Sequence, residues 1–340
     1  MKGDMDKKPI GVIILNWNGA ELLRRYLPSV VKCNSDRIAD VVVVDNGSTD
    51  NSRDVLREEF PGVRTLFFTE NYGYADGYNR AIKALGYEYS LLLNSDVEVT
   101  PGWLLPLYDY MQANSDVAAC QPKLLSETDK SRFEYAGASG GFIDKHGYPY
   151  CRGRIFDTVE KDCGQYDDII DIFWATGAAL MVRTEIYLAA GGLDKDFFAH
   201  MEEIDLCWRI RQRGYAVRVV PQSSVYHLGG GSLPASNPRK TYLNFRNNLF
   251  LLYKNLPVKQ GRRMLFVRRL YDTLAFLMFV AKLDFANARA VIRAHNDFRR
   301  QRSRYDGIQP VRSITVDYPC FRKNIIIRYY LLRHRRFSTL

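Results

Sequence analysis

The 340-residue sequence predicts an α/β fold in which a doubly wound, mostly parallel sheet is covered by helices. Short apolar runs alternate with amphipathic helical segments through the first hundred residues. The runs are apolar at consecutive positions, as in parallel strands that are buried on both faces. Because strands and helices alternate in this way, we expect βα units joined by crossover connections.

The predicted elements follow one another at short intervals. Strands are expected at 11–15, 41–44, 63–68 and 91–93, and helices at 20–32, from 48 or 49 onward, and at 76–85. Pro28 should kink or split the first helix, because proline cannot donate the helical hydrogen bond. Beyond residue 100 we expect helices at 103–111 and 201–213 and strands at 173–183 and 214–221.

Charge divides the chain into two parts. Residues 239–340 carry 23 Lys and Arg against 5 Asp and no Glu, whereas residues 1–238 carry 25 basic and 33 acidic residues. We therefore predict an α/β domain over residues 1–235, divided near residue 100 into 1–100 and 101–235, and a basic, mainly helical extension over 236–340. The six scattered cysteines and the polar N-terminus favour a cytoplasmic protein without disulfides or a signal peptide.

Polar residues follow the predicted strands where each strand ends. Asn16 follows the first strand, and Asp45 follows the second. Ligands bind at the carboxyl ends of parallel strands, so both side chains should face one crevice, where a carboxylate can accept from a ribose hydroxyl or a base N–H. The alternative is turn chemistry alone, since Asp-Asn-Gly readily forms turns. The missing GxGxxG motif disfavours a Rossmann dinucleotide site.

The fourth strand ends abruptly in Asn94, Ser95 and Asp96. A buried strand that delivers a carboxylate at its carboxyl end can present a metal or phosphate ligand. A polar turn is the simpler interpretation of the same residues.

Four segments resemble, in order, the successive motifs of glycosyltransferase family 2, and most closely those of its rhamnosyltransferase-like bacterial branch. They are VIILNWN at 12–18, VVVDNGSTD at 42–50, NYGYADGYN at 71–79 and LLNSD at 92–96. The resemblance covers about residues 8–235. It implies the GT-A fold, in which a nucleotide-binding half is joined to an acceptor-binding half.

The resemblance also implies residue roles on the donor side. The positions of Asn16 and Asp45 hold the nucleotide of the sugar donor in this family. The segment that contains Gly73 and Asn79 lies against the nucleotide and donor, and we assign Asn94 and Ser95 to the same side.

A divalent cation, Mg²⁺ or Mn²⁺, is implied by two further positions. Asp96 matches the last carboxylate of the family's DxD-type metal motif, and His227 matches the residue that completes the metal site. Asn94 stands where the motif has its first Asp, so the site offers one anionic ligand fewer. From the residues alone, a lone histidine after a strand is more often structural. The glycines at 229–231 suit a loop that closes over the diphosphate.

Glu202 and Glu203 lie in the first turn of the helix predicted at 201–213. Acids favour helix N-termini, so the spacing alone indicates a capping role. The segment also resembles the family's Glu-Asp-x-Asp-Leu-x-x-Arg motif, whose second acid is the general base. This implies catalysis by Glu203, with Glu202 as the alternative.

Three further residues are implied on the acceptor side. Asp205 belongs to the same acidic motif as Glu203. Thr176 and Gly177 form a small-residue bend that matches the segment lining the acceptor and sugar pocket, where small residues permit close approach.

The basic extension mixes aromatic, aliphatic and cationic residues without an apolar run of bilayer length. We predict interfacial helices that rest on anionic lipid at the inner face of the cell membrane. The alternative is a helical bundle packed on the catalytic domain or on another subunit, which would make the protein a homo-oligomer. No recognition motif supports nucleic-acid binding.

Together these features predict an inverting, metal-dependent hexosyltransferase of cell-surface polysaccharide synthesis. Its donor would be a UDP- or dTDP-sugar, and its acceptor a saccharide or lipid-linked saccharide. The alternatives are a nucleotidyltransferase of related α/β fold and a catalytically silent module that docks on a membrane or partner.

Overall fold

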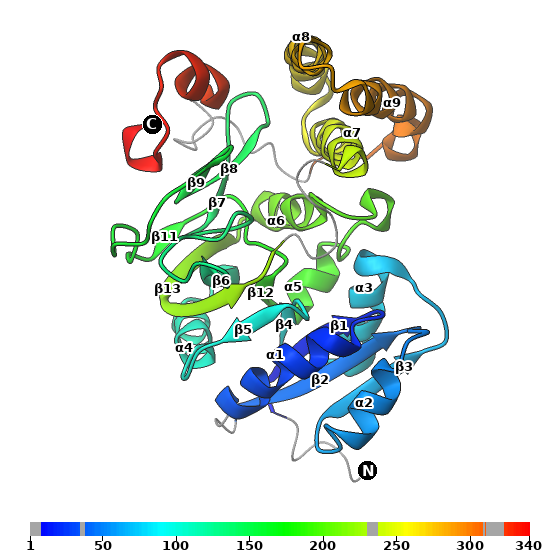
Figure 1. Ribbon diagram of the computed structural model, residues 1–340, viewed down its shortest axis with the longest axis vertical. Coiled ribbons are helices and arrows are strands. Elements are labelled where there is room, and N and C mark those ends of the chain that lie inside the picture. The colour runs from blue at the N-terminus through cyan, green and yellow to red at the C-terminus, as the bar shows by residue number, and fades with distance from the viewer. Residues whose placement is uncertain (1–7, 35–37, 230–236, 309, 311–322) are drawn as a thin grey trace.

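The computed structural model describes residues 8–34, 38–229, 237–308, 310 and 323–340. A nine-stranded sheet runs through the lower and middle parts of the molecule, with helices on both of its faces (Figure 1). The first part of the chain forms β1 (Ile10–Asn16), α1 (Ala20–Cys33), β2 (Ala39–Asn46), α2 (Ser52–Glu58), β3 (Arg64–Phe68), α3 (Gly73–Leu85), β4 (Tyr89–Leu93), β5 (Val97–Val99) and α4 (Leu104–Ala113). The neighbouring strands in the order β4-β1-β2-β3 are all parallel.

The second part of the chain extends this sheet with strands of both directions. It forms β6 (Val117–Ser126), β11 (Ile170–Asp171), β12 (Ala179–Arg183), α5 (Thr184–Ala189), α6 (Glu202–Gln212) and β13 (Ala216–His227). The strand order is β11-β13-β6-β12-β4-β1-β2-β3, with β5 paired to β13. Strand β12 is antiparallel to both of its neighbours, β4 and β6. The predicted α/β class with a mostly parallel sheet is therefore confirmed.

A smaller antiparallel sheet separates β6 from β12 along the chain. It consists of β7 (Gly141–Ile143), β8 (Pro149–Cys151), β9 (Arg154–Ile155) and β10 (Thr158–Val159), in the order β10-β9-β8-β7. No strand was predicted here, because these strands are only two or three residues long.

Several boundaries differ from the prediction. Helix α1 continues through Pro28 without a break. Helix α2 begins at Ser52 instead of 48 or 49, because Asp50 turns its carboxylate to the N–H groups of Ala20 and Ser52. The strand expected over 173–183 is regular only from Ala179.

Two apolar layers, one on each face of the sheet, form the core. Val43 of β2 lies in the layer under α1, α2 and α4, whereas Val42 and Val44 lie in the layer with α3, α5 and α6. Each of these valines is fully buried. The consecutive apolar residues of the central strands are explained by this double covering.

The basic extension begins with three helices, α7 (Pro238–Asn255), α8 (Val258–Ala281) and α9 (Phe285–Gln301). Helix α7 packs on α6, and α8 and α9 lie beyond it at one end of the long axis (Figure 1). The C-terminal residues form a π-helical turn, Ile327–Leu331. None of the helices in the described ranges combines the length and the apolarity that a membrane crossing requires.

A buried ionic cluster joins α6 to α7. Asp205 is fully buried and lies 2.6 Å from Arg209 Nη2 and 2.9 Å from Lys254 Nζ. Asn255 Nδ2 donates to the second oxygen of the carboxylate at 2.7 Å. Burial alone would raise the pKa of Asp205, but Arg209 and Lys254 hold it below its usual value. This α6–α7 seam fixes the extension's first helix to the α/β domain.

We expect Asp205→Ala to lower the free energy of unfolding by about 3 kcal/mol, because it leaves buried cations short of a counter-charge. Asp54→Ala is the matched control. Asp54 and its partner Arg57 are 66% and 65% exposed, so we expect a loss below about 1 kcal/mol. Urea denaturation of both variants checks this prediction, and equal losses would contradict it.

Candidate functional site

The carboxyl ends of β1 and β2 bring two polar side chains together. Asn16 and Asp45 are direct partners in the strand register, and both are fully buried. Asn16 Nδ2 donates to Asp45 Oδ2 at 3.3 Å. The topology therefore places the two predicted nucleotide residues in contact at one edge of the sheet.

Asp45 is held in place by further donors. Arg53 Nε donates to its Oδ1 at 2.8 Å, and the N–H of Ser48 donates to the same oxygen at 3.2 Å. The Ser48 bond is the turn contact that the simpler interpretation expected. Asn16 Oδ1 is buried and has no hydrogen-bond partner among the described residues. Since buried polar atoms are rarely unpaired, this acceptor fits a ligand N–H or hydroxyl.

Gly73 and Asn79, both assigned to the donor side, lie on α3. Gly73 has a φ of +75°, which suits glycine at the start of the helix. Asn79 Nδ2 donates to the carbonyl of Leu193 at 2.8 Å, and its Oδ1 accepts from the N–H of Leu193 and from the Tyr187 hydroxyl. The structure therefore places Asn79 in a link between α3 and the segment that precedes α6.

Asp96 and His227 lie side by side at the end of β4 and β13. His227 Nε2 is 3.2 Å from Asp96 Oδ1, and His227 Nδ1 is 3.5 Å from Oε1 of Glu134. His227 and Glu134 are buried, whereas Asn94, Ser95 and Asp96 are partly exposed. Burial alone would lower the pKa of His227, but the two carboxylates raise it to about 10.

This donor set suits a divalent cation that is shared with a diphosphate. Within the described residues, no group of three or more His, Cys, Asp and Glu has metal-binding geometry. Asp96 and His227 nevertheless lie at adjacent positions in negative surroundings, where Asp96 offers an oxygen ligand and His227, once it has lost its proton to an arriving cation, a nitrogen ligand. Mg²⁺ and Mn²⁺ sites are commonly completed by substrate phosphates. Residues 230–236, which include most of the expected glycine loop, lie outside the described residues.

Glu202 and Glu203 follow a turn with unusual backbone geometry. Phe198, His200 and Met201 have φ values of +69°, +68° and +76°, which are rare for residues with side chains. Asn247 of α7 stabilises this turn, because its Nδ2 donates to the carbonyls of Phe197, Ala199 and His200. Strained turns of this kind persist where their surroundings determine them, and they occur often at active sites.

The two acids differ in accessibility. Glu202 is 6% exposed, whereas Glu203 is only partly buried. One oxygen of each carboxylate has no hydrogen-bond partner among the described residues. Burial raises the pKa of Glu203 to about 7, and burial together with the neighbouring Glu203 raises the pKa of Glu202 well above its usual value. Glu203 therefore combines access with a pKa suited to accepting a proton near neutral pH.

A tyrosine links the acids to the donor side. Tyr74 Oη donates to the carbonyl of Gly177 at 2.9 Å and lies 3.5 Å from Asn94 Oδ1. A Cβ atom at Gly177 would lie 2.7 Å from Tyr74 Oη and 3.8 Å from Cβ of Glu203. Glycine is therefore required for this close approach. Thr176 is buried and accepts from the N–H of Ala178. Asp205 lies in the α6–α7 seam described above.

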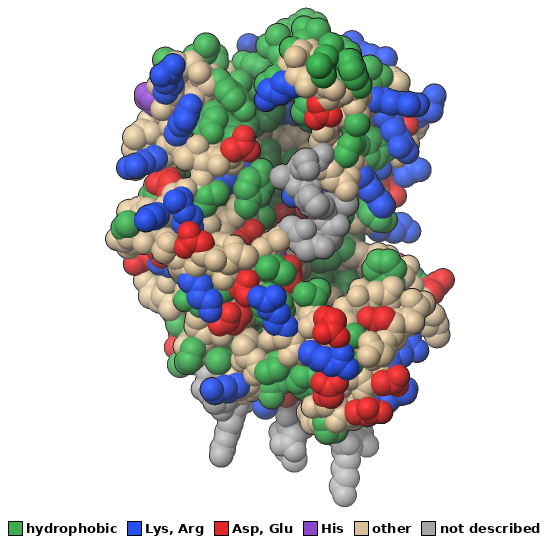
Figure 2. Space-filling view, in the orientation of Figure 1, with side chains coloured by type: hydrophobic (Ala, Val, Ile, Leu, Met, Phe, Trp, Pro, Cys, Tyr) green, Lys and Arg blue, Asp and Glu red, His purple; other side chains and the backbone are tan. Residues whose placement is uncertain are grey.

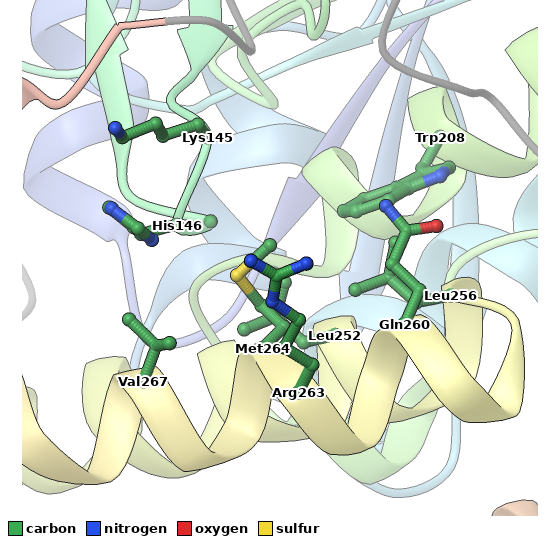
Figure 3. Close-up of a pocket in the computed structure, with 10 residues that line it drawn as sticks. Lys145, His146, Trp208, Leu252, Leu256, Gln260, Arg263, Met264 and Val267 are labelled. Atoms are coloured by element: carbon green, nitrogen blue, oxygen red, sulfur yellow. The ribbon is translucent and has the colours of Figure 1, made fainter.

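A separate cavity of about 470 Å³ opens between the β7–β8 turn and α6, α7 and α8 (Figure 3). Lys145 and His146 lie on one side of it, and Arg263 and Met264 of α8 lie on the other. Asp96, Glu203 and His227 do not line it. The cavity is therefore distinct from the cluster of predicted site residues.

The sequence is similar to those of known glycosyltransferases. Residues 11–161 match the sequence model of the family described as "Glycosyl transferase family 2". This part of the chain therefore has the sequence of a family 2 glycosyltransferase. An N-acetylglucosaminyl-diphospho-decaprenol L-rhamnosyltransferase of Mycobacterium tuberculosis is 26% identical over 231 residues, which cover 64% of this chain and 75% of that protein. A low-salt glycan biosynthesis hexosyltransferase, Agl10 of Haloferax volcanii, is 23% identical over 79% of this chain and 81% of its own length.

Solved structures support the GT-A fold. GalNAc-T7 with UDP, GalNAc and Mn²⁺ aligns with a TM-score of 0.57 and 14% identity, over 90% of this chain and 59% of that one. The mannosyltransferase PcManGT of Pyrobaculum calidifontis, in complex with GDP-Man and Mn²⁺, aligns with a TM-score of 0.53 and 15% identity, over 86% and 88% of the two chains. At these identities the likeness concerns the fold alone.

Three residues near the site were missed from the sequence. Glu134 lies 93 positions before His227 in a stretch with no regular pattern, and Asn247 lies in the extension. Tyr74 lies within the segment 71–79, but the family resemblance implies no role for it. The only available signal was the position of Tyr74 between Gly73 and Asn79.

Glu134 lies 3.5 Å from the His227 ring nitrogen that does not face Asp96, where a carboxylate can hold the orientation of a metal-ligating imidazole. We expect Glu134→Gln to raise the Mn²⁺ concentration for half-maximal binding about 10- to 100-fold. Electron paramagnetic resonance of Mn²⁺ with a nucleoside diphosphate present measures this.

Glu98→Gln serves as the control for that experiment. Glu98 lies two residues from Asp96 but pairs with Lys130 at 2.8 Å. Removal of the Glu98 charge should leave the Mn²⁺ concentration for half-maximal binding unchanged. Equal effects of the two variants would show that general negative charge, and not the Glu134–His227 contact, supports the cation.

Proposed function

We propose that the protein is an inverting, metal-dependent hexosyltransferase that uses a UDP- or dTDP-sugar. Its acceptor would be a saccharide or a lipid-linked saccharide in cell-surface polysaccharide synthesis. One observation carries the proposal: Glu203, which is less buried than Glu202 and has a pKa of about 7, lies beside Gly177, which Tyr74 connects to the donor-side Asn94.

On the donor side, Asn16 and Asp45 would hold the nucleoside. The unpaired Oδ1 of Asn16 supports this role, because it can accept from a base N–H or a ribose hydroxyl. Asp96 and His227 would hold a Mg²⁺ or Mn²⁺ ion. When bound, the ion would neutralise charge on the departing diphosphate.

On the acceptor side, Glu203 would remove the proton of the attacking hydroxyl. The hydroxyl oxygen then forms a bond to the anomeric carbon while the bond to the diphosphate breaks on the opposite face, so the configuration is inverted. The proton remains on Glu203, and the electron pair leaves with the diphosphate. The small residues around Gly177 support access of a sugar to this carboxylate.

A lipid carrier for the acceptor is suggested by a relative. The Mycobacterium tuberculosis protein is named for a substrate on diphospho-decaprenol and for transfer of L-rhamnose. By analogy we propose a lipid-linked acceptor and place the reaction at the inner face of the cell membrane, with the enzyme peripheral to the bilayer.

Incubation with a panel of UDP- and dTDP-sugars, acceptor and Mn²⁺ tests the proposal. Release of nucleoside diphosphate supports sugar transfer. Release of sugar 1-phosphate, by attack on the α-phosphorus, would instead indicate a nucleotidyltransferase. No turnover of any sugar nucleotide would favour a silent docking module.

With an active donor, we expect Glu203→Gln to lower kcat about 10²- to 10⁴-fold, because the amide cannot accept the proton. Glu202→Gln is the matched control and should keep most of the activity, since Glu202 is almost fully buried. Circular dichroism spectra of both variants should match that of the wild type, which checks that they are folded. The reverse order of the two losses would assign the base to Glu202.

A further inference from the structure

Helix α8 differs from an ordinary bundle helix, because the side chains that it buries are charged and several of its apolar side chains are exposed. Of its 24 residues, only Gly261, Arg268 and Asp272 are buried. Arg268 Nη2 pairs with Asp272 Oδ1 at 3.2 Å, and the Arg268 guanidinium stacks over the ring of Tyr148. The side of α8 that faces the protein is therefore anchored by an ion pair and a cation–π contact, whereas several of its large apolar side chains are exposed.

Those apolar side chains form a stripe on the outer side of α8. Phe266, Leu270, Leu274 and Leu277 are 64%, 55%, 61% and 53% exposed. Their spacing of four, four and three residues places them on one side of the helix. Met278 extends the stripe, and we call these five residues the α8 face. Contiguous exposed apolar patches on soluble domains commonly mark interaction surfaces.

Positive charge surrounds the α8 face. Lys259, Arg262, Arg263 and Arg269 of the same helix are exposed, and its single acid, Asp272, is buried. Residues 258–306 contain 12 Lys and Arg against 4 Asp and no Glu. In Figure 2, apolar side chains gather at the end of the molecule where α8 lies, with Lys and Arg beside them.

The C-terminal turn presents a second surface of the same kind. Tyr330, Leu331 and Leu332 are 54%, 74% and 56% exposed. Arg333, Arg335 and Arg336 follow directly. This segment and α8 lie at the same end of the molecule's long axis (Figure 1). Apolar and cationic groups from two separate segments are thus exposed at one end.

We propose that the α8 face is a docking surface for an anionic lipid bilayer. Helices that lie in a membrane interface bury an apolar side among acyl chains while flanking Lys and Arg contact anionic headgroups. A second copy of the chain would cover the apolar side equally well, but it would bring two strongly basic helices together. The proposal develops the suggested lipid-linked acceptor, and binding to vesicles tests it without donor or acceptor.

Co-sedimentation of the full-length protein with vesicles tests the proposal. We expect binding to phosphatidylcholine vesicles with about 30% phosphatidylglycerol, and much weaker binding to pure phosphatidylcholine. Leu270→Glu combined with Leu274→Glu should reduce binding to anionic vesicles at least about tenfold. Both residues are exposed, so the variant should fold.

A matched control carries Leu105→Glu and Leu188→Glu, on α4 and α5. These leucines are 42% and 46% exposed and lie outside the extension. The control should bind vesicles like the wild type. Equal binding by both double variants, or no binding by the wild type, would overturn the proposal. A wild-type dimer that Leu270→Glu with Leu274→Glu converts to a monomer would assign the face to a second copy. Vesicle binding without any sugar transfer would refute the proposed function and leave the docking surface standing.

Discussion

Asp205 is fully buried between Arg209 of its own helix and Lys254 and Asn255 of α7, and this seam orients the helix that carries Glu203. Two turns earlier, Asn247 of α7 binds three carbonyl groups of the segment that leads into α6. A charge buried this deeply requires its partners, so α6 and α7 cannot separate cheaply. The position of the proposed base therefore depends on a helix outside the family's recognisable motifs.

The basic extension accordingly has two roles in this account. Helix α7 belongs structurally to the catalytic half, as the bundle alternative expected, and it supports the turn before Glu202. Helix α8 contributes little buried apolar surface and exposes its leucines at the far end of the molecule. Helix α7 packs on α6 and leads into α8. A protein held at a bilayer through α8 would therefore keep α6, which carries Glu203, connected to the membrane through α7.

The sequence predicted the features that depend on local pattern and topology. The buried strands were recognisable because they are apolar at consecutive positions, and parallel topology then required Asn16 and Asp45 to meet. Contacts between distant segments were not predictable. Asn79 contacts Leu193, which is 114 residues away, and His227 contacts Glu134 across an irregular stretch. Spacing also could not distinguish an exposed apolar helix side from a buried one, because both follow the same periodicity.

The central claim is that Glu203 acts as the general base and that its burial tunes its pKa to about 7. The pH dependence of kcat/KM for sugar transfer, measured at saturating Mn²⁺, tests it most directly. The carboxylate must be deprotonated to act, so the rate should rise about tenfold per pH unit below pH 7 and level off above it. Glu203→Gln should remove this inflection. A wild-type profile that is flat between pH 5 and 8, or an unchanged inflection in Glu203→Gln, would contradict the account.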